Sequence, residues 1–106
     1  MPPAGAPAEL ATLSRRIGED RLLVQAAGGN TSYKEAGVMW VKASGKRLKD
    51  AERQTIFVAV DVEKAVAEID GAGDGTCRAA VLDQTNALRP SIETAFHALL
   101  PQRWVL

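Results

Sequence analysis

The sequence predicts a single α/β domain, and three observations carry this prediction. Apolar residues recur at helical spacing near both ends of the chain, over residues 10–17 and 92–100. Two segments between these ends, residues 38–43 and 56–60, are rich in β-forming residues. The chain has 106 residues, of which 46% are hydrophobic, and this length is enough for one domain with a modest core.

The N-terminal part predicts one helix. Residues 1–7 contain three prolines and are expected to form a flexible lead-in. The helical pattern begins at Ala8, and Gly18 is expected to end it. Residues 22–27 form an apolar run that is too short for its periodicity to distinguish a strand from a helix.

A β-hairpin and a buried strand are predicted next. Residues 31–34 and 38–43 would pair through a short turn that contains a glycine. Residues 56–60 form a continuous apolar run with three β-branched residues, which is typical of a buried strand. Asp61 then suits the N-cap of a helix over residues 62–69, because a carboxylate accepts hydrogen bonds from the first free N–H groups.

The C-terminal part predicts a further helix. It would begin at Ser91 as N-cap or with Pro90 in the first turn. Its apolar stripe would consist of Ile92, Ala95, Phe96, Leu99 and Leu100. Residues 104–106 resemble the start of a buried strand, and Trp40 and Trp104 are expected in the core.

Composition excludes several functions. Thirteen basic and thirteen acidic residues cancel, so no basic field favours nucleic acid or an anionic membrane. No apolar run approaches the length of a membrane span, and the N-terminus lacks the features of a secretory signal. The single cysteine, Cys77, favours the cytoplasm. One cysteine and one histidine cannot supply the three or four ligands of an ordinary zinc site, so no metal site is predicted within the chain.

Two glycine-containing loops are candidate anion sites. Gly28 and Gly29 precede Asn30, and consecutive glycines let backbone N–H groups converge on an anion. Ser44 and Gly45 follow the 38–43 strand and could place a hydroxyl and an N–H group near a phosphate. Each loop can equally be an ordinary tight turn.

Glu93 is the candidate acid/base residue. It lies at the border of the predicted apolar stripe, and His97 follows one turn later on the same helix face. A carboxylate in such a position can line a cleft and transfer protons. Alternatively, Glu93 only complements the helix dipole, with His97 as a half-buried partner.

Three segments, taken in order, resemble the class II aldolase/adducin family. They are residues 23–32 (LVQAAGGNTS), residues 40–45 (WVKASG) and residues 89–97 (RPSIETAFH). The likeness is greatest to the sugar-phosphate aldolase-like members. It implies a three-layer α/β/α domain with a mostly antiparallel central sheet, of which residues 8–106 would be the N-terminal portion.

The resemblance also implies a function and a set of site residues. Enzymes of the family cleave or epimerise sugar phosphates, with zinc or another divalent metal that polarises the substrate. The matching residues assign Glu93 as acid/base. They assign phosphate binding to Gly29, Asn30, Ser44, Gly45 and Ser91.

The chain departs from the family pattern in two ways. Ile92 stands where the family often has a second hydroxyl residue. The metal-binding histidines of the family would follow Leu106, so this chain is expected to hold no metal and to be inactive alone, as a truncated domain. Two other interpretations of the function stay open: a non-catalytic, adducin-like assembly module and a small anion-binding domain.

Unpaired edges at residues 38–43 and 104–106 predict a homo-oligomer. The predicted ligand is a sugar-phosphate-like small molecule.

Overall fold

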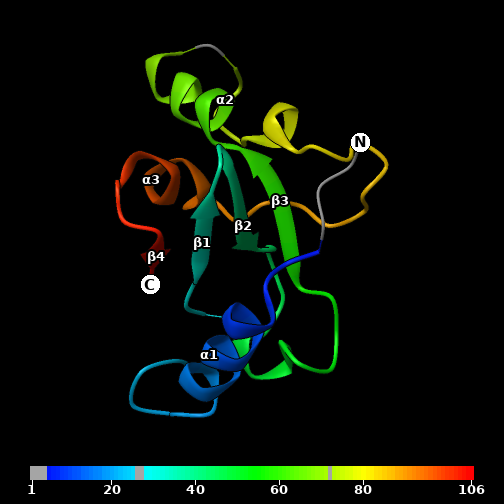
Figure 1. The fold of residues 1–106 in the computed structure, drawn as a ribbon, viewed down its shortest axis with the longest axis vertical. Coiled ribbons are helices and arrows are strands. Elements are labelled where there is room, and N and C mark those ends of the chain that lie inside the picture. Colours follow the sequence, from blue (N-terminus) through cyan, green and yellow to red (C-terminus); the bar gives the residue numbers. More distant parts are fainter. Residues whose placement is uncertain (1–4, 26–27, 72) are drawn as a thin grey trace.

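The computed structural model describes residues 5–25, 28–71 and 73–106. In chain order these residues form α1 (Ala8–Gly18), β1 (Ser32–Glu35), β2 (Val38–Lys42), β3 (Phe57–Asp61), α2 (Val62–Ala67), α3 (Thr94–Leu99) and β4 (Trp104–Val105). Three single-turn 3-10 helices complete them: η1 (Leu48–Asp50), η2 (Glu68–Asp70) and η3 (Arg78–Ala80). Figure 1 shows the strands at the centre, with α1 at one end and α2 and α3 at the other.

The strands form one antiparallel sheet in the order β3-β2-β1-β4. The predicted hairpin is confirmed, since Glu35 pairs with Val38 across the turn. Ala36 and Gly37 both have positive φ, as a type I′ turn requires. Because β2 pairs on both sides, the prediction that residues 38–43 form an unpaired edge is wrong. The sheet edges in the described part of the chain are β3 and β4.

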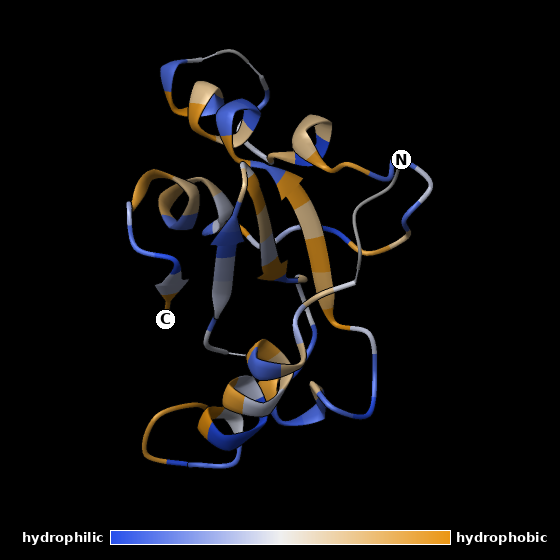
Figure 2. Cartoon of the chain, viewed as in Figure 1, coloured by the Kyte–Doolittle hydropathy of each residue, from blue (hydrophilic) through white to orange (hydrophobic). Residues whose placement is uncertain are grey.

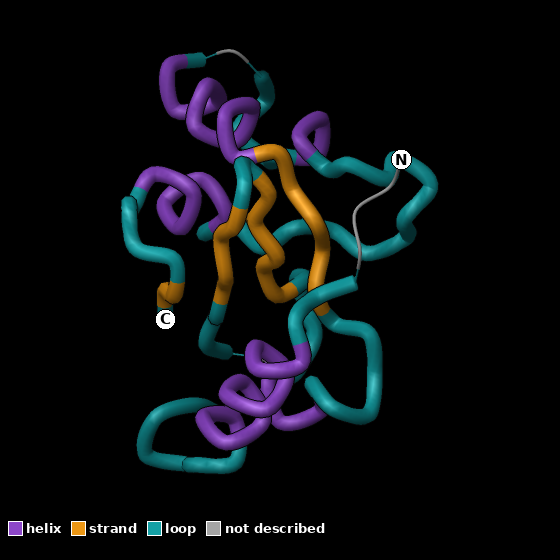
Figure 3. The backbone as a smooth tube through the Cα atoms, viewed as in Figure 1, coloured by secondary structure: helices purple, strands orange, loops and turns teal. Residues whose placement is uncertain are grey.

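Side chains alternate between the two faces of the sheet and so divide the core in two. One cluster takes Met39 and Val41 of β2 and is covered by α2, η3 and α3. The other cluster takes Trp40 of the same strand and is covered by α1 and the segment after η1. Helices therefore pack against both faces, which confirms the predicted α/β/α layering with an antiparallel sheet. Figure 3 shows the strands between α1 at the bottom and α2 at the top.

The start and cap of the middle helix are also confirmed. The Asp61 carboxylate accepts a hydrogen bond of 3.1 Å from the N–H group of Lys64. This helix, α2, ends at Ala67 and continues as a 3-10 turn, and Gly71 closes it with φ of +89°. Figure 2 shows that β2 and β3 are predominantly hydrophobic, whereas β1 is more hydrophilic. The hydrophilic strand β1 lies nearest to α3 in the same view.

The predicted burial of the C-terminal stripe is wrong. Ile92 is 90% exposed, and Phe96, Leu99 and Leu100 are exposed as well. The buried face of α3 consists instead of Thr94, His97 and Ala98. Polar contacts fix which face of α3 turns toward the sheet. The Thr94 hydroxyl donates to the carbonyl of Ser91, and the ring of His97 forms a hydrogen bond with Ser32 of β1.

Two further expectations concern the ends of the chain. Trp40 is buried as predicted, but Trp104 is 40% exposed and packs against the ring of Tyr33. Residues 1–4 of the expected lead-in, and Ala26 and Ala27 of the 22–27 run, lie outside the described residues. Among the residues that the structure describes, no helix is long and apolar enough to cross a membrane.

Candidate functional site

The loop at Gly29 has a conformation that only glycine fits. Its φ is +79°, and a Cβ atom there would meet the Val24 side chain at 2.9 Å and Leu48 at 3.2 Å. A side chain at this position would therefore strain the backbone and clash with packed neighbours. The loop thereby directs the next residue, Asn30, toward the interior.

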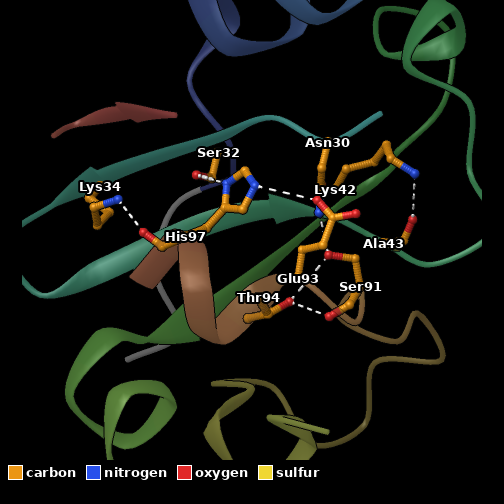
Figure 4. A network of polar contacts seen from close by, with 9 residues as sticks. All are labelled: Asn30, Ser32, Lys34, Lys42, Ala43, Ser91, Glu93, Thr94 and His97. Atoms are coloured by element: carbon orange, nitrogen blue, oxygen red, sulfur yellow. Dashed lines mark hydrogen bonds and ion pairs between the residues drawn. The ribbon is translucent and has the colours of Figure 1, made fainter. Parts of the chain in front are cut away.

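Asn30 joins this loop to the segment before α3. Its Nδ2 group donates a hydrogen bond to Oγ of Ser91, and both side chains are buried (Figure 4). Its Oδ1 atom is buried and has no hydrogen-bond partner among the described residues. A buried carbonyl oxygen without a donor is costly, so this atom marks an uncompensated polar group beside Ser91.

Ser44 lies beside the same segment at the end of β2. Its N–H group donates to the carbonyl of Arg89 at 2.8 Å, next to a bridge between Ala43 and Pro90. Gly45 follows with φ of +78° and open space where a Cβ would point. The structure thus brings four of the predicted residues, Asn30, Ser44, Gly45 and Ser91, to the same end of β2.

Ser91 does not act as the predicted N-cap. The helix α3 begins at Thr94, and its N-cap, Glu93, makes no side-chain capping bond. Thr94 turns back instead: both its N–H group (3.2 Å) and its hydroxyl (2.7 Å) donate to the carbonyl of Ser91. The Ser91 hydroxyl is thereby left for Asn30, with the Thr94 hydroxyl 3.4 Å away.

His97 lies between β1 and Glu93 and is 4% exposed, so it is more deeply buried than the half-buried partner of the helix-dipole alternative (Figure 4). Its Nδ1 atom is 2.7 Å from the Ser32 hydroxyl, and its Nε2 atom is 3.9 Å from Oε2 of Glu93. An ionised carboxylate only accepts hydrogen bonds. The arrangement therefore favours the tautomer in which Nε2 carries the proton toward Glu93 and Nδ1 accepts from Ser32.

Burial lowers the pKa of His97, and the charge of Lys34 lowers it further, whereas Glu93 opposes the shift. The Lys34 ammonium also donates to the backbone carbonyl of His97 at 2.6 Å. The ring is therefore neutral near neutral pH. A neutral ring can orient a carboxylate without adding a second charge to the site.

Lys42 is a site residue that sequence reasoning missed. It is 3% exposed, and its ammonium donates to the carbonyls of Lys46 (2.8 Å) and Ala43 (3.3 Å). Burial lowers its pKa, and the negative charge of Glu93 opposes that shift. The sequence analysis placed residues 38–43 at an unpaired edge, whereas β2 pairs with a strand on each side and Lys42 is buried there.

Glu93 is thus an exposed carboxylate beside two buried groups. It faces a neutral imidazole, and a buried ammonium on β2 attracts its charge. This arrangement keeps the carboxylate reachable by a ligand while holding it in place. It suits proton transfer to or from a bound molecule.

The described residues do not fit a divalent metal. Across residues 5–25, 28–71 and 73–106, no three His, Cys, Asp or Glu side chains are grouped closely enough to hold one. The one histidine uses Nδ1 on Ser32. Cys77 is buried among apolar residues, and burial raises the pKa of its thiol to about 11, so it stays protonated.

The chain matches known proteins over most of its length. The model of the Class II Aldolase and Adducin N-terminal domain matches residues 8–103. An N-terminal class II aldolase domain of a conserved protein from Thermoplasma acidophilum superimposes with a TM-score of 0.71 and 31% identity, over 91% of this chain. YuxG of Bacillus subtilis (strain 168), called an uncharacterized oxidoreductase, is 33% identical over 92% of this chain.

This chain is shorter than both of these relatives. It spans 51% of the Thermoplasma acidophilum chain and 16% of YuxG. The family model nevertheless covers β1, β2 and β3 and every predicted site residue from Gly29 to Glu93. On that match and on the shared fold, the chain belongs to the Class II Aldolase and Adducin N-terminal domain family.

Proposed function

We propose that this chain supplies the acid/base residue and part of the substrate site for aldolase-type chemistry on a sugar phosphate. The observation that carries the proposal is the placement of Glu93. Its carboxylate is exposed to a ligand, and its Oε2 atom lies 3.9 Å from Nε2 of the buried His97 ring. A surface carboxylate that only complemented a helix dipole would need neither that ring nor the buried Lys42 ammonium.

In this proposal Glu93 moves a proton during carbon–carbon cleavage or its reversal. The carboxylate takes the proton of a substrate hydroxyl, the adjacent carbon–carbon bond breaks, and its electron pair passes to the neighbouring carbonyl to give an enediolate. Protonation of the enediolate completes the reaction. The Nε2 atom of His97 lies 3.9 Å from this carboxylate, and the buried ammonium of Lys42 attracts its negative charge.

The neutral polar loops would hold the substrate. We assign Gly29, Asn30, Ser44, Gly45 and Ser91 to the phosphate end, as the family resemblance implies. Asn30→Ala or Ser44→Ala should weaken binding of a ketose phosphate with little effect on turnover at saturation. Each change removes a group that acts alike on the ground state and the transition state.

The test is the rate at which a full-length version of the protein, with the metal-binding histidines, releases aldehyde from a panel of ketose 1-phosphates. Glu93→Gln keeps the shape of the side chain but cannot ionise, and we expect a loss of about 10²–10⁴-fold in turnover. Glu63→Gln, a change of an exposed glutamate on α2, is the matched control. If Glu93→Gln retains full activity, Glu93 is only a helix-dipole residue and the proposal fails.

A second candidate function, assembly without catalysis, has its own supporting observation. Six large apolar side chains at and around α3 and β4 are exposed: Ile92, Phe96, Leu99, Leu100, Trp104 and Leu106. An apolar surface next to a sheet edge favours contact with a second copy of the chain. A cytoplasmic homo-oligomer would serve either function, and the Glu93→Gln assay distinguishes the two.

A further inference from the structure

The strand β3 presents backbone polar groups to the outer edge of the sheet. The N–H group of Ala43 donates to the carbonyl of Ile56 at 2.7 Å, so the backbone groups of Ile56 point toward β2. The direction of these groups alternates from one residue to the next along an antiparallel strand. The N–H and C=O groups of Phe57 and Ala59 therefore point away from the sheet.

The segment after η3 covers only one end of this edge. Val81 bridges to Val60, and the N–H group of Leu82 donates to the carbonyl of Ala59 at 3.0 Å. Beyond these contacts the segment leaves β3, as the yellow part of the ribbon in Figure 1 shows. Three backbone groups are left without a partner among the described residues: the N–H and C=O groups of Phe57 and the N–H group of Ala59.

A pocket of about 330 Å³ lies where the two segments separate. Phe57 and Ala59 line it from β3, and Val81 and Asp83 line it from the segment after η3. Most of the other lining side chains are apolar, with Trp40 of β2 among them. A pocket of this volume with an apolar, aromatic lining and a few polar groups is typical of a site for a small molecule.

The open part of the edge is too short for the addition of a peptide strand. Phe57 and Ala59 are two positions apart, which corresponds to about 7 Å along a strand. The contacts of residues 81 and 82 block the edge beyond Ala59. A small planar ring fits this length. Its amino group would donate to the carbonyl of Phe57, and an adjacent unprotonated ring nitrogen would accept from the N–H group of Ala59.

The charge of the pocket restricts the ligand further. Asp83 is the one ionisable side chain among the described residues that line the pocket. Its Oδ1 atom accepts hydrogen bonds from the hydroxyl (2.5 Å) and the N–H group (3.0 Å) of Thr85. These bonds lower the pKa of Asp83, so the carboxylate is ionised near neutral pH. It repels a phosphate, whereas its Oδ2 atom can accept from a sugar hydroxyl.

We propose that this pocket binds an aminopurine nucleoside, with the base on the edge of β3 and the ribose at Asp83. The inference is independent of the proposed function, because the pocket shares no residue with the set around Glu93. Its aromatic residues, Trp40 and Phe57, belong to the core cluster on the α1 side of the sheet.

The experiment is a titration of the chain with adenosine, followed by amide chemical shifts in NMR. We expect the amides of Phe57 and Ala59 to shift together. Inosine is the matched control ligand, because it carries a carbonyl and a ring N–H where adenosine carries an amino group and a bare nitrogen. Each of these groups would meet its own kind on β3. Inosine should therefore bind at least about 10-fold more weakly than adenosine.

A pair of variants tests the backbone contact directly. Ala59→Pro removes the N–H group from an edge position, where proline is tolerated because that group does not bond within the sheet. It should weaken adenosine binding about 5- to 10-fold, the effect of one lost hydrogen bond. Ala59→Gly keeps the N–H group and should change the affinity little.

Three results would overturn the proposal: no shift of the two amides with adenosine, equal binding of inosine and adenosine, or unchanged binding in Ala59→Pro. If Ala59→Pro does not fold, the comparison of the two nucleosides on the unaltered chain decides. Tighter binding of adenosine monophosphate than of adenosine would contradict the placement of the ribose at Asp83.

Discussion

His97 should make the free energy of unfolding of the domain depend on pH just below the ordinary pKa of a histidine. It is the single histidine of the chain, and burial lowers its pKa in the folded state. The unfolded chain binds the proton near the ordinary value of about 6.5. Between the pKa of His97 in the folded state and its pKa in the unfolded state, the unfolded state holds more protons. The free energy of unfolding therefore falls as the pH falls.

The size of this effect follows from one proton. At about one pH unit below the ordinary value, an unfolded histidine is about 90% protonated, and the folded state loses up to about 1.4 kcal/mol relative to neutral pH. At pH values above the ordinary histidine pKa, the contribution of the neutral His97 ring to the free energy of unfolding is fully present and constant. Asp74 and Asp83 have lowered pKa values because of hydrogen bonds from threonines, so their effects belong to more acidic solutions.

The assay is urea unfolding followed by tryptophan fluorescence, at several pH values from about 8 to about 5.5, which spans the ordinary histidine pKa. His97→Gln keeps a hydrogen-bonding group next to Ser32 but cannot titrate, so its stability should be nearly independent of pH in this range. If the wild-type chain and His97→Gln lose the same stability on acidification, His97 is not held neutral. The tautomer assigned to the site would then be refuted.

Three further predictions concern single positions. Gly29→Ala should destabilise the domain by about 1–3 kcal/mol in urea unfolding, because the backbone has positive φ and Val24 lies 2.9 Å from the new Cβ; an unchanged midpoint would contradict the packed loop. Lys42→Met removes a buried charge and should stabilise the fold or leave it unchanged, while reducing the turnover that depends on Glu93; unchanged turnover would remove Lys42 from the site. Phe96→Glu should shift light scattering of a self-associated chain toward the monomer, and a wild-type chain that is monomeric at micromolar concentration would contradict the proposed assembly.

Local signals in the sequence were sufficient for most of the fold. The hairpin turn, the N-cap at Asp61 and the helix from Ala8 to Gly18 each depend on residues that are neighbours in the chain. Such features are decided by short-range sterics and hydrogen bonds, which a sequence displays directly. The layered arrangement was implied by the family resemblance and is confirmed.

The rotation of α3 could not be predicted in this way. Apolar periodicity favoured a buried face around Phe96, but long-range polar contacts bury Thr94 and His97 instead. The hydroxyl of Ser32 that bonds to His97 is 65 positions away in the sequence. Periodicity measures only how hydrophobic a face is, and it cannot recognise a polar face that has partners on a distant strand.

The composition of the buried region beside α3 argues for function rather than stability. Lys42 and His97 both have pKa values lowered by burial, so the fold bears the cost of removing their polar groups from water. Asn30 adds a buried oxygen without a described partner. A core selected only for stability would fill such positions with apolar side chains of similar volume. The three polar groups instead surround one exposed carboxylate, Glu93, so their cost is best explained by a ligand that this carboxylate meets.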